Sequence, residues 1–140
     1  MSVTILVADD NPEFLHVVRS LLEAQEPPFV VHTVDTGERA LAFLEHRPPY
    51  ADSPRPTFMV LDYRLPDMRA TSILGYMRAQ PDLRALPVLV LSQAGWAEDA
   101  AAARDAGATA FRVKPSRARE LLHFIKEFWS THVGADDPAD

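Results

Sequence analysis

Five polar residues directly follow short apolar runs of the sequence. They supply three carboxylates, one hydroxyl and one ammonium group: Asp9 and Asp10 after Val3–Ala8, Asp62 after Thr57–Leu61, Ser92 after Pro87–Leu91, and Lys114 after Ala108–Val113. If the runs are parallel strands, these side chains converge, because ligands bind outside the carboxyl ends of such strands. Three carboxylates in one pocket repel one another, which raises their pKa values unless a cation compensates.

A hard divalent cation would balance this negative charge. Magnesium takes oxygen ligands and typically uses one or two carboxylates together with a phosphoryl oxygen. The ammonium group of Lys114 and the hydroxyl of Ser92 would suit the remaining oxygens of a phosphoryl group. An aspartate can itself act as a nucleophile and form an aspartyl phosphate. The residue types therefore predict magnesium-dependent phosphoryl transfer onto an aspartate.

The elements that would position these residues alternate along the chain. The four runs named above and Phe29–Val34 have the length and composition of strands, and segments of helical periodicity separate them. The first, third and fourth runs are almost wholly apolar, whereas His32, Thr33 and Arg112 mark the second and fifth as edge strands. We therefore predict an α/β fold, a doubly wound five-stranded parallel sheet in the order 2-1-3-4-5 with five helices.

Length and composition indicate one acidic domain. The chain has 140 residues, with 14 Lys and Arg against 20 Asp and Glu, and its net charge of −6 argues against a nucleic-acid partner. No apolar run approaches the ~20 residues needed to cross a bilayer, so no membrane partner is expected. The absence of cysteines is compatible with a reducing cytoplasm, where we expect the protein. We predict a domain over 1–133 and a frayed acidic tail over 134–140.

The strand-end residues, together with Phe111 and Pro115, resemble those of a known family. Asp9-Asp10, Asp62, Ser92 and Lys114-Pro115 match, in order and spacing, the CheY-like receiver domain of two-component response regulators. The resemblance implies a signalling switch, not an enzyme, which accepts a phosphoryl group from a sensor histidine kinase. Such a domain assists its own phosphorylation and dephosphorylation. Because no residues remain for an output domain, we expect a stand-alone receiver.

The resemblance also implies the residues that hold magnesium and the phosphoryl group. Asp62 corresponds to the phospho-acceptor, which in the family is also a metal ligand. Asp10 corresponds to a direct magnesium ligand, and Asp9 to one that acts mainly through water. The backbone carbonyl of Arg64 would complete the protein ligands.

Three further residues correspond to the moving parts of the family's switch. Ser92 is similar to the hydroxyl that moves to bind the phosphoryl group, and Lys114 to its ion-pair partner. Phe111 corresponds to the aromatic residue whose inward or outward rotamer reports the phosphorylation state. We also predict a cis Lys114–Pro115 bond that positions the lysine, because X–Pro bonds tolerate the cis form at a cost of about 0.5–1 kcal/mol.

The sequence departs from the family pattern at several positions. Ala70 stands where glycine is usual, which puts the tight turn into the third helix in doubt. Gln93 follows the switch serine where alanine or glycine is common, and it could narrow access to the phosphoryl group. We expect the side chain of Arg64 to pair with a phosphoryl oxygen or an acidic neighbour, with a solvated arginine as the alternative.

Two other classes of function remain open. A phosphatase-type enzyme with an aspartate nucleophile needs an acidic residue two positions after the nucleophile. In this chain the residue two positions after Asp62 is Arg64. A degenerate receiver, acting only as a phosphorylation-independent interaction module, normally loses the acceptor or the lysine, and this chain keeps both.

The last helix suggests a second partner besides the kinase. Its apolar residues cover a stripe of about 160° on a helical wheel, wider than packing on a sheet needs. We expect Phe124, Phe128 or Trp129 to leave aromatic surface exposed, and we predict a two-fold homodimer through the fourth helix, fifth strand and fifth helix. The proline-rich connector Arg47–Pro56 and the bulky final helix look similar to small receivers paired with bacterial phytochrome kinases, so the kinase could be a phytochrome.

Overall fold

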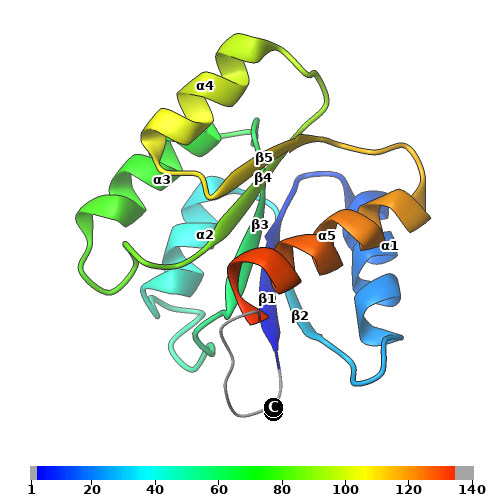
Figure 1. The fold of residues 1–140 in the computed structure, drawn as a ribbon. Helices are drawn as coiled ribbons and strands as arrows, with labels where there is room; N and C mark the ends of the chain where they lie inside the picture. Colours follow the sequence, from blue (N-terminus) through cyan, green and yellow to red (C-terminus); the bar gives the residue numbers. More distant parts are fainter. Residues whose placement is uncertain (1–2, 135–140) are drawn as a thin grey trace.

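The computed structural model describes residues 3–134 and shows strands and helices in strict alternation (Figure 1). The elements are β1 (Thr4–Ala8), α1 (Pro12–Glu23), β2 (Val30–Val34), α2 (Gly37–Leu44), β3 (Phe58–Asp62), α3 (Ala70–Ala79), β4 (Val88–Ser92), α4 (Ala97–Ala106), β5 (Ala110–Val113) and α5 (Ala118–His132). The predicted α/β fold with five strands and five helices is confirmed. The tail predicted over 134–140 lies outside the described residues, except for its first residue.

The five strands form one parallel sheet in the predicted order β2-β1-β3-β4-β5. Every residue of β3 and β4 is buried, and β1 is buried from its second residue onward. The edge strands β2 and β5 each leave residues exposed. Because all strands run in one direction, β1, β3, β4 and β5 bring their carboxyl ends to the same edge of the sheet.

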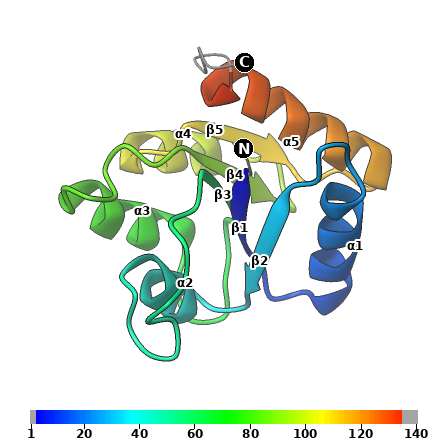
Figure 2. The same cartoon turned by 90° about the horizontal axis from the view of Figure 1, so that it is seen from below.

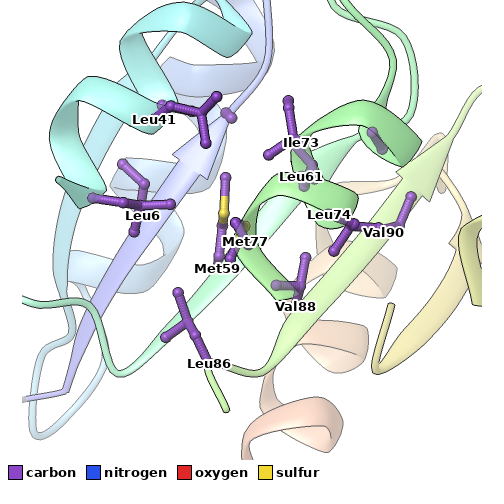
Figure 3. Close-up of a cluster of buried hydrophobic side chains, with 14 of the residues drawn as sticks. Leu6, Leu41, Met59, Leu61, Ile73, Leu74, Met77, Leu86, Val88 and Val90 are labelled. Atoms are coloured by element: carbon purple, nitrogen blue, oxygen red, sulfur yellow. The ribbon is translucent and has the colours of Figure 1, made fainter. Parts of the chain in front are cut away.

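Helices cover both faces of this sheet (Figures 1 and 2). Helices α1 and α5 pack together on one face, and α2, α3 and α4 lie on the other. Successive residues of a strand point to opposite faces, so Phe58 enters the core under α1 and α5 while Met59 enters the core under α2 and α3. In the second core, Ile73 and Met77 of α3 meet the strand side chains (Figure 3).

Local residue types explain where two of the helices begin and end. Pro12 stands at the start of α1, and the Asn11 side chain accepts hydrogen bonds from the backbone N–H groups of the first turn. Helix α4 ends at Gly107, whose φ of +113° lies in the left-handed region that favours glycine. The Arg78 guanidinium joins this helix end to the segment between α3 and β4, because it donates to the carbonyl oxygens of Gly107, Leu83, Arg84 and Leu86.

The aromatic residues of α5 are less exposed than predicted. Phe128 is buried against Phe58, and Trp129 is half-buried between Phe58 and Phe29. The ring of Phe124 is partly covered, with the guanidinium of Arg112 5.6 Å from its centroid. The wheel overestimated the exposed surface because the end of α5 also packs against the start of β3 and the residue before β2. Within residues 3–134, no helix combines the length and apolar character needed to cross a membrane.

The segment between β3 and α3 forms its turn with Ala70 at the position where the family pattern usually has glycine. Helix α3 begins at Ala70 itself, and the Ala70 N–H donates to the carbonyl of Tyr63 at 2.9 Å. Arg64 and Arg69 form an isolated antiparallel bridge across the segment. The two carboxylate oxygens of Asp67 accept from the backbone N–H groups that begin α2, at 2.8 and 2.9 Å. These contacts fix the loop that follows the predicted acceptor.

Candidate functional site

The three predicted carboxylates come together at the carboxyl ends of β1 and β3. Asp9 and Asp10 follow β1, Asp62 is the last residue of β3, and an oxygen from each lies within 4.8 Å of the other two. Asp9 and Asp62 are buried, with 1% and 8% of their surface exposed, while Asp10 faces solvent. Asp9 also accepts a hydrogen bond from the Asn11 backbone N–H at 2.8 Å, which ties the cluster to the start of α1.

Lys114 brings one positive charge to this cluster. Its Nζ lies 2.5 Å from Asp9 Oδ2 and 3.9 Å from Asp62 Oδ2, and 8% of its side chain is exposed. The ammonium group also lies 4.3 Å from the centroid of the Phe14 ring, a favourable cation–π geometry. Three carboxylates against one ammonium group leave the site with an excess of negative charge.

The predicted cis Lys114–Pro115 bond is wrong. In the described part of the chain, the cis peptide bonds are Glu26–Pro27 and Pro48–Pro49. The lysine reaches Asp9 without a cis bond, because its backbone continues the β5 strand and its N–H donates to the Ser92 carbonyl at 2.7 Å. Strand pairing therefore positions this side chain.

Burial and charge repulsion both act on Asp62. Burial, followed by the negative charges of Asp9 and Asp10, raises its pKa from 3.8 to about 6, although Lys114 and the backbone N–H of Arg64 act against this rise. A further positive charge beside this group would stabilise its ionised form and lower its pKa again. All three donors are hard carboxylate oxygens, the ligands that magnesium prefers. The residues present therefore fit a divalent cation.

A pocket of about 480 Å³ opens above the carboxylates. It is lined by Asp10, Asp62, Arg64, Ser92, Gln93, Trp96 and Lys114, among others. Ser92 ends β4 and is 3% exposed, and its hydroxyl accepts a hydrogen bond from the Ala94 backbone N–H at 3.3 Å. Gln93 is exposed at the wall of the pocket. The hydroxyl and the ammonium group predicted to face a phosphoryl group thus share one cavity with Asp62.

Phe111 points into the core. It is 9% exposed, belongs to the cluster beneath α2, α3 and α4, and packs edge-on against Tyr63 with ring centroids 6.2 Å apart. Tyr63 follows Asp62 directly in the sequence, so the Phe111 ring contacts the residue beside the predicted acceptor. Its rotamer-switch role stays a prediction, as does the ligand role of the Arg64 carbonyl.

The side chain of Arg64 has an acidic neighbour, which is one of the two outcomes expected for it. Its Nη2 lies 3.4 Å from Asp99 Oδ2, and its guanidinium carbon lies 5.8 Å from the centroid of the Trp96 ring. The sequence reasoning did not single out Asp99, because an acidic residue in a first helical turn is common and favourable on dipole grounds alone. Its burial, 8% exposed, is the signal that only the structure provides.

The chain is similar to known proteins over almost its whole length. Residues 5–126 match the profile of the response regulator receiver domain. Response regulator Rcp1 of Synechocystis sp. is 27% identical over 128 residues, covering 89% of this chain and 87% of Rcp1. The solved structure of the bacteriophytochrome response regulator RtBRR is 25% identical, with a TM-score of 0.76 and coverage of 91% and 78%. The phosphorylated cyanobacterial phytochrome response regulator RcpA has the same fold, with a TM-score of 0.88, 24% identity and coverage of 99% and 100%.

Sequence, fold and strand-end residues agree with one another. The family profile extends from β1 into α5 and so includes every strand end that contributes to the pocket. The order of the strands and the covering of the sheet by helices on both faces are those of the similar solved structures. On these grounds the chain belongs to the response regulator receiver domain family of two-component signalling.

Proposed function

We propose that this receiver domain accepts a phosphoryl group on Asp62 from a sensor histidine kinase, in a magnesium-dependent reaction, and thereby switches a protein-interaction surface. The observation that carries this proposal is the position of Asp62. It ends the central strand β3 with its carboxylate in an open pocket, 3.9 Å from the ammonium group of Lys114 and beside two further carboxylates.

The proposed step is an in-line displacement at phosphorus. An ionised oxygen of Asp62 attacks, the bond between phosphorus and the donor's imidazole nitrogen breaks, and the imidazole keeps that electron pair and takes up a proton. With a pKa of about 6, Asp62 is mostly ionised at neutral pH, as a nucleophile must be. Lys114 and Ser92 line the same pocket as Asp62, where their ammonium and hydroxyl groups would bind oxygens of the transferred phosphoryl group.

Asp9, Asp10 and Asp62, with the backbone carbonyl of Arg64, would hold the magnesium ion. When bound, magnesium would neutralise charge on the phosphoryl oxygens and lower the repulsion between them and the aspartates. Asp9 already has a second partner in Lys114, at 2.5 Å, so Asp10 is the carboxylate most available to an ion from solvent.

The two alternative functions have less support. A phosphatase-type site would want an acid where Arg64 stands, and the Arg64 side chain is paired with Asp99. A degenerate receiver would lack the acceptor or the lysine, whereas Asp62 and Lys114 share one pocket. We therefore assign a phospho-accepting switch rather than an enzyme that turns over a substrate.

We infer that the kinase is a phytochrome and that the transfer takes place in the cytoplasm. The support is the similarity to RcpA and RtBRR, whose names describe response regulators of a phytochrome and a bacteriophytochrome. The test is phosphotransfer from a purified phytochrome kinase, with a histidine kinase of another sensor class as control. Equal transfer rates from both would contradict the inferred pairing.

We also propose a homodimer through α4, β5 and α5, now on different residues from those expected. On this face, the large apolar side chains most exposed are Trp96, at 55%, and Val113, at 46%. The indole of Trp96 and the side chain of Val113 are the apolar surface that such a dimer would bury. Light scattering should give a dimeric mass for the wild type and a smaller mass for Val113→Lys, and a monomeric wild type would contradict the proposal.

Incubation with magnesium and acetyl phosphate separates the three functions. A phospho-receiver gives one phosphoryl group per chain, seen by intact-protein mass spectrometry, and Asp62→Asn gives none. Continuous release of phosphate over many turnovers would favour the phosphatase. No modification of the folded wild type, in the presence of magnesium, would favour the interaction module.

A further inference from the structure

Arg64 connects the pocket to helix α4. It stands two residues after Asp62 and lines the same pocket, yet its guanidinium is paired with Asp99 in the first turn of α4, at 3.4 Å. The Trp96 ring, at the start of that helix, lies 5.8 Å from the guanidinium carbon. Nearly half of the Arg64 side chain is exposed, so its long, flexible stem is free to move at the mouth of the pocket.

The two anionic positions available to Arg64 are unequal. Asp99 offers a single carboxylate with one negative charge, whereas a phosphoryl group on Asp62 would carry close to two charges and three acceptor oxygens. A guanidinium pairs with phosphate through two parallel hydrogen bonds, which are stronger than one long contact of 3.4 Å. A phosphoryl group in this pocket would therefore compete with Asp99 for Arg64.

Helix α4 is held weakly at the end where Asp99 lies. Of its ten residues, Asp99 and Ala103 are buried, and no side chain caps its first turn. Asp99 is 8% exposed, so losing its cationic partner would leave a nearly buried carboxylate uncompensated. A carboxylate in this situation moves toward water, and the first turn of α4 would move with it.

We propose that Arg64 exchanges partners on phosphorylation, leaving Asp99 for the phosphoryl group on Asp62 and so releasing the first turn of α4 together with Trp96. This inference rests on the proposed function and adds its regulatory link. Asp99 acts here as a positioning residue, because it reaches the phosphoryl group only through Arg64. The exchange joins the state of Asp62 to an exposed aromatic residue that a partner protein can contact.

A double-mutant cycle with beryllofluoride, which mimics the phosphoryl group, tests the exchange. The measured quantity is the apparent Kd for beryllofluoride at saturating magnesium, obtained by titration calorimetry. Arg64→Gln should weaken binding by about fivefold or more, and Asp99→Asn should tighten it by about fivefold, because a partly exposed ion pair contributes about this much. In the Arg64→Gln background, Asp99→Asn should have almost no effect.

Glu98→Gln is the matched control, because Glu98 is an exposed acid in the same first turn and its replacement makes the same change in charge. We expect it to change the apparent Kd by less than Asp99→Asn does. In a Trp129→Phe background, Trp96 is the remaining tryptophan and its fluorescence can be followed alone. Beryllofluoride should change this fluorescence more when Arg64 is present than in the Arg64→Gln variant. This second signal reports movement of the Arg64 guanidinium away from the Trp96 ring on beryllofluoride binding, which a merely structural role of Asp99 would not produce.

The outcomes separate this inference from the proposed function. Equal effects of Asp99→Asn in both backgrounds, or an equal effect of Glu98→Gln, would overturn the partner exchange while leaving Asp62 as the acceptor. No magnesium-dependent binding of beryllofluoride to the wild type would overturn both. The exchange would be supported if Asp99→Asn tightened beryllofluoride binding only when Arg64 is present. The beryllofluoride-induced change in Trp96 fluorescence should also require Arg64.

Discussion

Replacing Asp62 with asparagine should stabilise the metal-free protein at neutral pH, even though it removes the proposed acceptor. Burial, helped by the charges of Asp9 and Asp10, raises the pKa of Asp62 from 3.8 to about 6. The folded state then binds a proton more tightly than the unfolded chain, so ionisation of Asp62 opposes folding. At about 1.36 kcal/mol for each pH unit, the rise corresponds to about 3 kcal/mol. This is an upper limit, because water reaches the carboxylate through the pocket.

The sign of this effect sets its pH dependence. As the pH rises from 3.8 through about 6, ionisation of Asp62 lowers the free energy of unfolding of the wild type. The Asp62→Asn variant has no carboxyl group at this position and does not lose this stability. In EDTA at pH 8, the variant should therefore unfold at a temperature higher by up to about 10 °C. At pH 4 the two proteins should unfold at similar temperatures. Asp52→Asn, at an exposed position in the connector between α2 and β3, is the matched control.

Thermal unfolding followed by circular dichroism, at pH 4 and pH 8 with and without magnesium, measures the effect. Magnesium should stabilise the wild type and narrow the gap to Asp62→Asn, because the ion binds the folded carboxylate cluster. An Asp62→Asn variant no more stable than the wild type at pH 8 would refute the reasoning. An equal gain at pH 4 would do the same, since it would show that ionisation is not the cause.

Three further substitutions test other parts of the account. Asp10→Ala should weaken magnesium binding by about 10-fold or more in a fluorescence or calorimetric titration, and unchanged affinity would exclude Asp10 as a ligand. Arg78→Met should lower the free energy of unfolding in urea by about 2–3 kcal/mol, because the charged hydrogen bonds to four backbone carbonyls are lost, whereas the exposed Arg84→Met should change it little. Partial burial alone would raise the pKa of Asp67, but backbone N–H groups, those of α2 first, outweigh it and lower that pKa. The wild type should therefore be more stable than Asp67→Asn above pH 3.8 and lose that advantage as the pH falls below it, and a pH-independent difference would contradict this role.

The parts of the fold set by local patterns could be predicted from the sequence. Apolar runs of strand length predicted the five strands, and the polar residues His32 and Arg112 predicted which two of them lie at the edges of the sheet. The convergence of Asp9, Asp62 and Lys114 followed from one rule, that parallel strands present their carboxyl ends at the same edge. These predictions succeeded because burial is visible in the apolar composition of each run, and the parallel direction of the strands follows from their alternation with helices.

Features that depend on packing between distant segments could not be predicted in this way. Asp99 lies 35 residues from Arg64, and nothing in the alanine-rich sequence around Asp99 indicates that it is buried. A helical wheel shows which residues share a side of α5, but not that Phe29 and Phe58 cover Trp129. The predicted cis Lys114–Pro115 bond was wrong, because a proline tolerates either isomer and the pairing of β5 with β4 positions the lysine without it.

Chemical mapping of the phosphorylated residue tests the central claim most directly. The protein is phosphorylated with acetyl phosphate and magnesium, and borohydride then reduces the acyl phosphate to the alcohol, so the modified aspartate is identified by peptide mass spectrometry. The account predicts reduction at Asp62 alone, and none in protein treated without magnesium. Reduction at Asp9 or Asp10 instead, or a magnesium-independent product at Asp62, would contradict it.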